Sequence, residues 1–369
     1  MRADALMGPL SDTVELPNFT QFKNESVSFL NHFSVTSPCG PARASLLTGQ
    51  YAMNHHSVRN GTPLAHDTPN LAKSLRSEGM EPLLYGYTDT SQDPRIFEES
   101  DPVLTSYEEV LSGFTEIQEM RVDTNKSWQN YLKDKKYKFG NLDDIYVPNG
   151  SELNSPAQYL AKHSETAFLT NRFLKDLNQR DAGWFAHLTY VKPHPPFVAP
   201  APYNSLLDPN IMPIPFYFDP SYKEHSFDSL SRQYKRSEDM VNGFDELDKS
   251  LQTTQKIRAI YMGLVAELDN HVGRIFSWLK ETGQYDETLV IMTSDHGEML
   301  GDYGCWGKMH YFDGAFHVPL MIKPSKSFNG DFGTTIDAPS ESIDVTPTIL
   351  DLMGIEIPDE MDGSTLKPF

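Results

Sequence analysis

The sequence is poor in several features that would assign it to other classes of protein. Two cysteines among 369 residues leave no disulfide framework, which is compatible with a reducing compartment. No apolar run reaches the length of about 18 residues that a membrane-spanning helix needs. The first residues do not resemble a secretory signal either. We therefore expect a cytoplasmic protein.

Positive charge is also scarce. Lys and Arg total 31 against 51 Asp and Glu, which gives a formal net charge of −20. Such a protein repels the phosphates of nucleic acids and of anionic membranes, so neither is expected as the principal partner. An anionic substrate would have to be held by local Arg, Lys and His side chains, because the field of the whole protein opposes it.

What the sequence does contain is an alternation of helical and strand patterns over an ordinary globular composition, 38% hydrophobic and 22% charged. Apolar residues at helical spacing predict helices over 69–78, 154–177 and 256–280. Apolar runs predict strands over 82–85, 184–190 and 288–293. The last run is continuous, which is typical of a strand covered on both faces. This order of elements indicates an α/β fold.

Two stretches interrupt the alternation and are interpreted as insertions, 110–153 and 197–254. The first is polar with a basic cluster at 133–138, and the second begins in a proline-rich segment, 193–220, that holds nine of the 26 prolines. Long insertions beside an α/β site commonly form its walls, although plain surface covering is the alternative.

The segment Cys39-Gly40-Pro41-Ala42-Arg43, followed by Ala44-Ser45-Leu46-Leu47-Thr48-Gly49, predicts a loop that enters a short helix. Pro41 suits a first helical turn, and Gly49 suits the position just after the last one. Cys39 would then lie at the positive end of a helix dipole, and Arg43 would add a fixed charge one turn later. The arrangement suits an oxyanion, whereas the alternative for Cys39 is a buried structural thiol.

A second group of polar residues, Ser294-Asp295-His296-Gly297-Glu298, follows the apolar run at 288–293 directly. Ligands of open α/β sheets bind just beyond the carboxyl ends of the strands, so Asp295 and His296 are placed to hold a divalent metal. Taken alone, an Asp-His-Gly sequence is more often a turn. Here it is followed by Gly307-Lys308-Met309 and by Phe316-His317-Val318-Pro319-Leu320.

These two groups together resemble the sulfatase family of the alkaline phosphatase superfamily. That family has a Cys-x-Pro-[Ser/Ala]-Arg signature with a Thr-Gly shortly after it, and a metal-binding Asp followed by Asn or His. The resemblance implies an alkaline-phosphatase-like mixed, mostly parallel sheet with helices on both faces, in one catalytic domain over 1–369. Within the family, the loop 86–89 and the segment 304–308 are most similar to phosphonate monoester hydrolases and phosphodiesterases.

The resemblance also implies roles for matching positions. Cys39 would be oxidised to formylglycine by a formylglycine-generating enzyme, and Arg43 would stabilise its alkoxide. His194 and Lys308 would contact substrate oxygens or the leaving group, and Asn60 and Tyr87 would contribute to substrate binding. One divalent ion, manganese, calcium or magnesium, would be held by Asp295, His296 and the modified Cys39.

The expected function is therefore metal-dependent hydrolysis of phosphonate monoesters or phosphodiesters, with a small anionic ester as substrate. Three alternatives stay open: an arylsulfatase or other sulfuric ester hydrolase, an inactive fragment or anion-binding relative, and an acyl hydrolase that uses Cys39 and His194. Homo-oligomerisation is also open. Family members begin with a buried strand that ends in an acidic metal ligand, so we expect that strand, with a further carboxylate upstream of Met1, and a C-terminal subdomain to be missing here.

Overall fold

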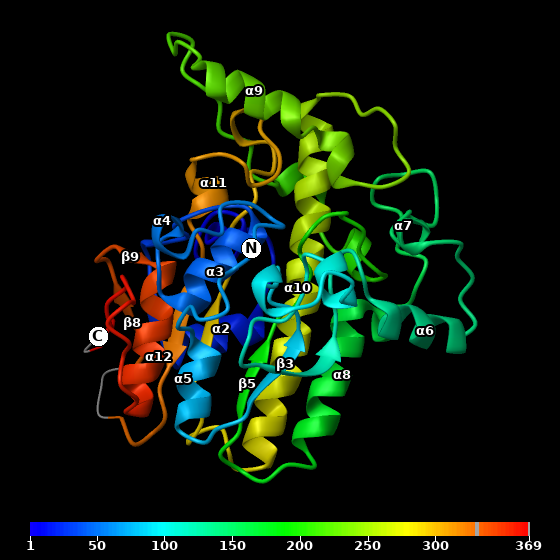
Figure 1. Cartoon of the computed structure of the whole chain (residues 1–369). Coiled ribbons are helices and arrows are strands. Elements are labelled where there is room, and N and C mark those ends of the chain that lie inside the picture. Colours follow the sequence, from blue (N-terminus) through cyan, green and yellow to red (C-terminus); the bar gives the residue numbers. More distant parts are fainter. Residues whose placement is uncertain (329–331, 368–369) are drawn as a thin grey trace.

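The computed structural model describes residues 1–328 and 332–367, and its strands form two main sheets that lie side by side (Figure 1). One sheet has the order β6-β7-β1-β8, formed by Val290–Thr293, Leu320–Lys323, Val27–Phe29 and Thr334–Ile336. The other has the order β4-β3-β5, formed by Thr115–Glu119, Pro82–Gly86 and Phe185–Leu188. A short ladder joins β2 (His32–Phe33) to β9 (Ser340–Glu341).

Most of the strand pairing is parallel. β3 is parallel to both β4 and β5, and the pairs β1–β8 and β2–β9 are parallel as well. Only β7 is antiparallel to its neighbours, β6 and β1, among the strands that the structure describes. The predicted mixed, mostly parallel sheet is therefore confirmed.

Helices cover both faces of the sheets. One face is covered by α2 (Pro17–Asn24) and α10 (Leu251–Glu281), and the other by α3 (Cys39–Thr48), α5 (Leu71–Ser77) and α12 (Val345–Met353). Successive residues of a strand point to opposite faces. Accordingly, Met321 of β7 packs into the core formed with α10, whereas Leu320 and Ile322 pack into the core formed with α3 and α12.

The other α-helices lie around these layers. They are α1 (Asp4–Met7), α4 (Ala52–His55), α6 (Lys126–Asp134), α7 (Leu142–Ile145), α8 (Glu165–Leu177), α9 (Ser226–Tyr234) and α11 (Asp313–Phe316). None of the described helices is both long enough and apolar enough to cross a bilayer.

The two helices that matter most for the site form as predicted. α3 begins at Cys39 and ends before Gly49, which has a φ of 65° and donates its N–H to the Ser45 carbonyl. α10 starts one turn earlier than predicted because the Ser250 hydroxyl accepts the N–H of Thr253 and so caps the helix.

The predicted helix over 154–177 is wrong in its first half. α8 begins only at Glu165, where the Ser164 hydroxyl accepts the Ala167 N–H. The preceding segment is irregular, and its Ala157 N–H donates to the Ala199 carbonyl. Tyr159 of this segment packs against the buried Trp128. The prediction fails because apolar residues of this loop reach the core at a spacing that resembles that of a helix.

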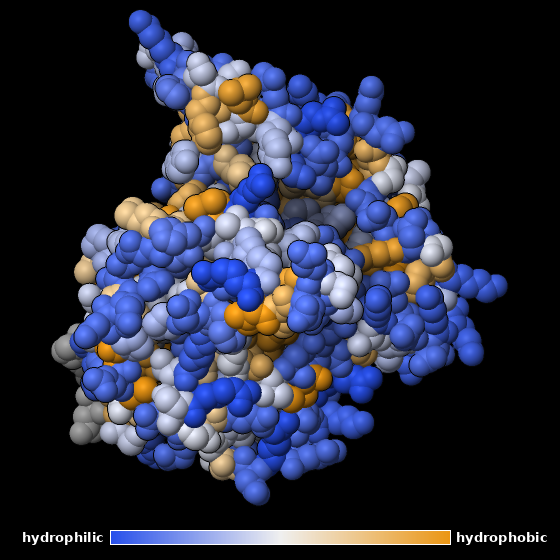
Figure 2. All heavy atoms as spheres, in the orientation of Figure 1, coloured by the Kyte–Doolittle hydropathy of each residue, from blue (hydrophilic) through white to orange (hydrophobic). Residues whose placement is uncertain are grey.

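The two stretches interpreted as insertions differ in how they pack. The stretch 110–153 carries α6 and α7 and inserts Trp128, which is fully buried, into a core beside β3 and α8. The stretch 197–254 carries α9, which projects from the body (Figure 1). Leu230 and Tyr234 on α9 are 65% and 68% exposed. Apolar side chains gather on this projection in Figure 2, while hydrophilic ones dominate most of the face shown.

The predicted strand at 288–293 is confirmed as β6, but it is not fully covered. Every residue of β3 and β7 is buried, whereas every residue of β6 and of β5 is partly exposed. Helices do lie on both faces of β6, so the exposure comes from an unpaired edge and from a cavity beside it.

Candidate active site

The carboxyl ends of three strands and the start of one helix meet at a single place. β6 leads into Asp295 and His296, β3 into Tyr87, and β5 into the loop that carries His194. The contact of His296 with Cys39 and the hydrogen bond of Arg43 to Tyr87 connect two of these ends to α3, whose first residue is Cys39. The predicted site residues therefore lie together at the carboxyl ends of the strands, where ligands of α/β sheets bind.

The first turn of α3 holds Cys39 in a buried position, 5% exposed. Amide groups of a first helical turn have no partner within the helix. Asn60 provides one, because its Oδ1 accepts the N–H of Gly40 at 2.9 Å. Asn60, predicted to bind substrate, is thus placed against the start of α3, where it fixes the residue next to Cys39.

Cys39, Asp295 and His296 each offer one ligand atom, and these atoms all lie within 4.8 Å of one another. The Cys39 Sγ is 3.2 Å from Nε2 of His296. The other ring nitrogen, Nδ1, donates to the Gly297 carbonyl at 2.8 Å, which leaves the lone pair of Nε2 directed at the cluster. Burial lowers the pKa of His296 to about 3, so the imidazole is neutral and able to ligate.

Asp295 supplies the negative charge of this cluster. Burial alone would raise the pKa of Asp295, but the positive charges of Arg43 and Lys308 nearby lower it below its ordinary value. Its Oδ2 accepts a hydrogen bond from Arg43 Nε at 2.9 Å. An ionised carboxylate, a neutral imidazole and a third side chain fit a divalent cation.

Arg43 is held on three sides. Besides Asp295, its guanidinium donates to the Tyr87 carbonyl at 3.0 Å and lies 4.0 Å above the centre of the Tyr87 ring. The side chain is nearly buried, so the positive charge cannot move away from the cluster. Tyr87, predicted to bind substrate, is therefore placed where it orients Arg43.

Lys308 and His194 form a pair on the other side of the cluster, with Lys308 Nζ 2.8 Å from Nε2 of His194. His194 Nδ1 donates to the Pro195 carbonyl at 2.6 Å, so Nε2 accepts from the lysine. Burial, with Lys308 and His296 nearby, lowers the pKa of His194 well below its ordinary value. Burial opposes the charge of Lys308, but Cys39 and Asp295 raise the pKa of its ammonium.

This geometry argues against an acyl hydrolase that uses Cys39 and His194. His194 is paired with Lys308, and the imidazole near the thiol belongs to His296. Burial raises the pKa of the Cys39 thiol, so it is protonated at neutral pH. A cysteine nucleophile needs a depressed pKa.

Three residues of the site were not identified from the sequence. Glu298 accepts the Gly307 N–H at 2.5 Å and so fixes the loop that presents Lys308. Asp89 has a φ of 54°, and burial raises its pKa to about 6. Lys192 lies under the His194 loop. In the sequence, Glu298 and Lys192 lie close to residues that were identified. A sequence does not show, however, which charged side chains are buried and which are exposed.

Lys192 is only 3% exposed and spans the loop that carries His194. Its Nζ donates to the carbonyls of His194 at 3.2 Å and Pro196 at 2.9 Å. Its charge is balanced by Glu165, 3.6 Å away, and its Nζ lies 4.5 Å from the centre of the Tyr146 ring. Lys192 therefore holds the loop without facing the cluster.

We expect Lys192→Met to lower kcat of the formylglycine-containing enzyme by about 10- to 100-fold, because a small displacement of a catalytic side chain has an effect of that size. Lys323→Met is the matched control. Lys323 is also buried and also donates to carbonyls, those of Tyr285 and Thr288, but lies far from His194 in the fold. Both variants should lose stability, and only the first should lose kcat per folded molecule. Equal kcat values would show that Lys192 is merely structural.

A protein-family model and curated proteins both match this chain over nearly its whole length. The family model described as Sulfatase matches residues 2–355. The multifunctional alkaline phosphatase superfamily protein PehA of Trinickia caryophylli is 38% identical over 371 residues, which are 96% of this chain and 71% of PehA. The choline-sulfatase of Rhizobium meliloti (strain 1021) is 28% identical over 98% of this chain and 67% of its own length.

Two solved structures are also similar to this chain over nearly its whole length. The phosphonate monoester hydrolase SpPMH from Silicibacter pomeroyi is 50% identical with a TM-score of 0.96, over 100% of this chain and 74% of that one. The phosphonate monoester hydrolase of Agrobacterium radiobacter is 36% identical with a TM-score of 0.86, over 97% and 72%.

Proposed function

The chain belongs to the sulfatase family, and we propose that it is a metal-dependent hydrolase of phosphonate monoesters and phosphodiesters that acts through a formylglycine made from Cys39. The observation that carries the proposal is the cluster of Cys39, Asp295 and His296 with Arg43 and Lys308 beside it. The likeness to two phosphonate monoester hydrolases supports the choice of ester.

The proposed modification explains why a cysteine occupies this position. A thiolate is a soft ligand beside a hard cation, whereas a hydrated aldehyde offers oxygen. The hydrated aldehyde made from Cys39 would supply one hydroxyl as the nucleophile that displaces the leaving alcohol from phosphorus. Its second hydroxyl would supply the proton whose loss drives C–O cleavage, which would release the product and restore the aldehyde for rehydration by water.

Asp295, His296 and the modified Cys39 would hold the divalent ion. When bound, the ion would polarise the ester and acidify the attacking hydroxyl. The imidazole ligand makes manganese more suitable than it would be at an all-oxygen site, while calcium and magnesium remain candidates.

The other residues act on charge and protons. Arg43, fixed by Asp295 and Tyr87, would stabilise the oxygen of the modified Cys39. Lys308 and His194 would contact substrate oxygens or the leaving group, and the Lys308 ammonium, oriented by Nε2 of His194, can donate a proton to the leaving group directly. Asn60 and Tyr87 would contribute to binding by holding Gly40 and Arg43 in place.

The ester preference is tested by kcat/KM for aryl phosphonate monoesters, phosphodiesters and aryl sulfates with one common leaving group, which removes differences in leaving-group chemistry. We expect the two phosphorus esters to react at least as well as the sulfate. Arg43, Lys308 and His194 do not separate singly charged esters, so discrimination would come from leaving-group contacts in the insertions 110–153 and 197–254.

A sulfuric ester hydrolase is the second candidate, favoured by the likeness to choline-sulfatase. A preference for the sulfate by more than about 100-fold, roughly 2.7 kcal/mol, would assign the protein to that class. No turnover of any of the three esters by protein with proven formylglycine would instead indicate an anion-binding relative.

We also infer the partners and location of the protein. The substrate would be a small anionic ester, and a formylglycine-generating enzyme would act on Cys39. A cytoplasmic location suits two cysteines that form no disulfide with each other.

A further inference from the structure

The loop that follows β3 contains a buried carboxyl oxygen without a hydrogen-bond partner. Asp89 is 5% exposed, and among the described residues none donates a hydrogen bond to its buried Oδ1. Burying a carboxylate oxygen without a donor costs free energy. Such a group requires an explanation, because nearly all buried polar groups of proteins are hydrogen-bonded.

The residues on either side of Asp89 hold the loop in place. The Thr88 hydroxyl donates to the Glu109 carbonyl at 3.1 Å and accepts the N–H of Leu111 at 2.7 Å. Thr90 donates its N–H to the same Glu109 carbonyl at 3.1 Å. These bonds fix the backbone of Asp89, which has a φ of 54°. The loop is thus held without the Asp89 carboxylate.

Asp89 lies among the groups of the candidate active site. Its carbonyl oxygen would be 3.2 Å from a Cβ placed on Gly40, the residue after Cys39. Burial raises the pKa of Asp89 to about 6, and the charges of Arg43 and Lys308 oppose that rise. Besides burial, the charge of Asp89 helps to raise the pKa of the Cys39 thiol. Asp89 is therefore an ionised carboxylate at neutral pH, close to the groups that would hold a substrate.

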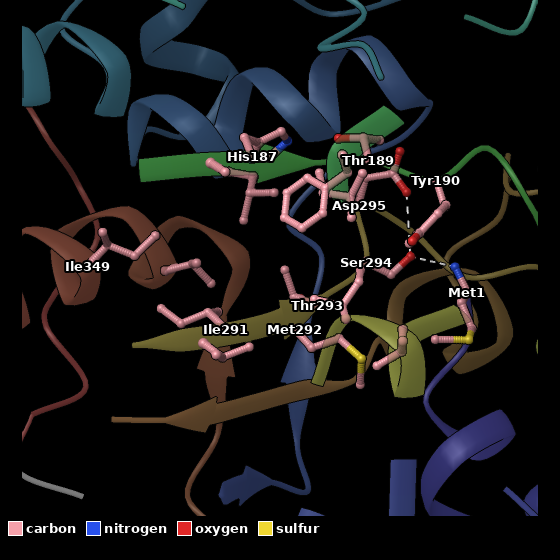
Figure 3. Close-up of a pocket in the computed structure, with 18 of the residues that line it drawn as sticks. Met1, His187, Thr189, Tyr190, Ile291, Met292, Thr293, Ser294, Asp295 and Ile349 are labelled. Atoms are coloured by element: carbon pink, nitrogen blue, oxygen red, sulfur yellow. Dashed lines mark hydrogen bonds between the residues drawn. The ribbon is translucent and has the colours of Figure 1, made fainter. Parts of the chain in front are cut away.

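Asp89 does not belong to the cluster of candidate metal ligands. Among the described residues, that cluster consists of Cys39, Asp295 and His296. Asp295 lies at the end of β6 (Figure 3), and Arg43 compensates its charge from 2.9 Å. Asp89 therefore adds a negative charge to the site that the hydrogen bonds of Arg43 do not compensate.

A carboxylate in this position acts against every additional negative charge on a ligand. It has no proton to donate to a phosphoryl oxygen, and like charges repel. Phosphonate monoesters, phosphodiesters and sulfate esters carry one negative charge, whereas phosphate monoesters carry about two at neutral pH. The cations Arg43 and Lys308 alone would attract the dianion more strongly, so a preference for singly charged esters needs an opposing charge.

We propose that Asp89 is a specificity-determining residue that disfavours doubly charged phosphate monoesters and so restricts the site to singly charged esters. The inference rests on the proposed function, because it specifies which esters that site accepts. It goes beyond that function, since it assigns the discrimination between ester charges to one side chain.

Two variants of Asp89 and one control test the proposal. Asp89→Asn removes the charge, keeps the shape and tolerates the positive φ. Asp89→Gly removes the whole side chain and tolerates the same φ. Glu108→Gln is the matched control, because Glu108 is 2% exposed and its carboxylate accepts the N–H groups of Val122 and Asp123. Thermal denaturation verifies that each variant is folded.

The first measurement is kcat/KM at about pH 8.5 for an aryl phosphate monoester and an aryl methylphosphonate monoester with the same leaving group. Both Asp89 variants should raise the ratio of phosphate to phosphonate by about tenfold or more, since a unit charge several ångströms away has an effect of that size. The control should keep the ratio within about threefold. An unchanged ratio in both Asp89 variants, or an equal rise in the control, would overturn the proposal.

The second measurement is binding, which does not depend on turnover. Titration calorimetry at about pH 8.5 compares inorganic phosphate, a dianion, with dimethyl phosphate, a monoanion. Asp89→Asn should bind phosphate about tenfold more tightly and dimethyl phosphate as before. This shift without hydrolysis of any ester would refute the proposed function and leave the role of Asp89 intact.

Two other outcomes would overturn the role of Asp89. Equal tightening of both anions in Asp89→Asn would show that Asp89 opposes anions without regard to their charge. A changed metal content of this variant, measured by elemental analysis, would assign the effect to the metal. We expect the metal content to be the same as in the unsubstituted protein.

Discussion

Cys39→Ala is expected to lower turnover by more than about 10⁴-fold, because the substitution removes the attacking group and one metal ligand together. The same change should abolish the mass loss of about 18 Da that marks conversion of a cysteine to formylglycine when the protein is produced with the modifying enzyme. Activity and the converted fraction should rise together in the unsubstituted protein.

Cys305→Ala is the matched control for this experiment. Cys305 is the other cysteine and is also buried, and its thiol donates a hydrogen bond to the Tyr303 carbonyl and packs with Met299 and Ala315. The control should keep both the mass loss and the turnover. A free thiol at Cys39 in fully active protein would refute the proposed mechanism.

Asp295→Asn is expected to remove the bound divalent ion and to lower kcat by about 10³-fold or more. The amide keeps the shape of the carboxylate but not its charge, and Arg43 and Lys308 then leave the cluster positive. Breaking the buried pair with Arg43 should also lower the free energy of unfolding by about 3 kcal/mol. Elemental analysis after dialysis measures the metal, and chemical denaturation measures the stability.

Asp302→Asn controls for the loss of a buried ion pair. Asp302 is bonded to Arg258 at 2.6 Å and to Arg2 at 2.9 Å, and its side chain is even less exposed than that of Asp295, 3% against 13%. The control should be destabilised while its folded molecules keep the metal. Unchanged metal content in Asp295→Asn would remove Asp295 from the ligand set.

The parts of the fold that were predictable are those whose signals are local. Pro41 and Gly49 mark the two ends of α3, and the apolar run at 288–293 marks β6. The placement of Asp295 and Cys39 at one site also followed, because strand ends and helix starts share an edge in α/β sheets. The start of α8 was predicted wrongly, because Tyr159 packs into the core from a loop at a position that fits helical spacing.

The parts that were not predictable depend on contacts between distant residues. The pairing of His194 with Lys308 joins positions 114 residues apart, and no local pattern encodes it. The burial of Lys192 beneath the His194 loop is of the same kind. The open edge of β6 could not be read from its own residues, which are as apolar as those of a fully covered strand.

The burial of α3 sets an order of events during biosynthesis. All residues of the helix from Cys39 to Thr48 are buried in the folded protein. Its partners Asp295 and His296 lie more than 250 positions later, so the helix is enclosed only after nearly the whole chain has been made. A modifying enzyme that reads Cys39 to Arg43 would therefore have to act on the nascent chain. Protein that folds before this encounter would keep its thiol, and we expect modifying enzyme added later not to convert it.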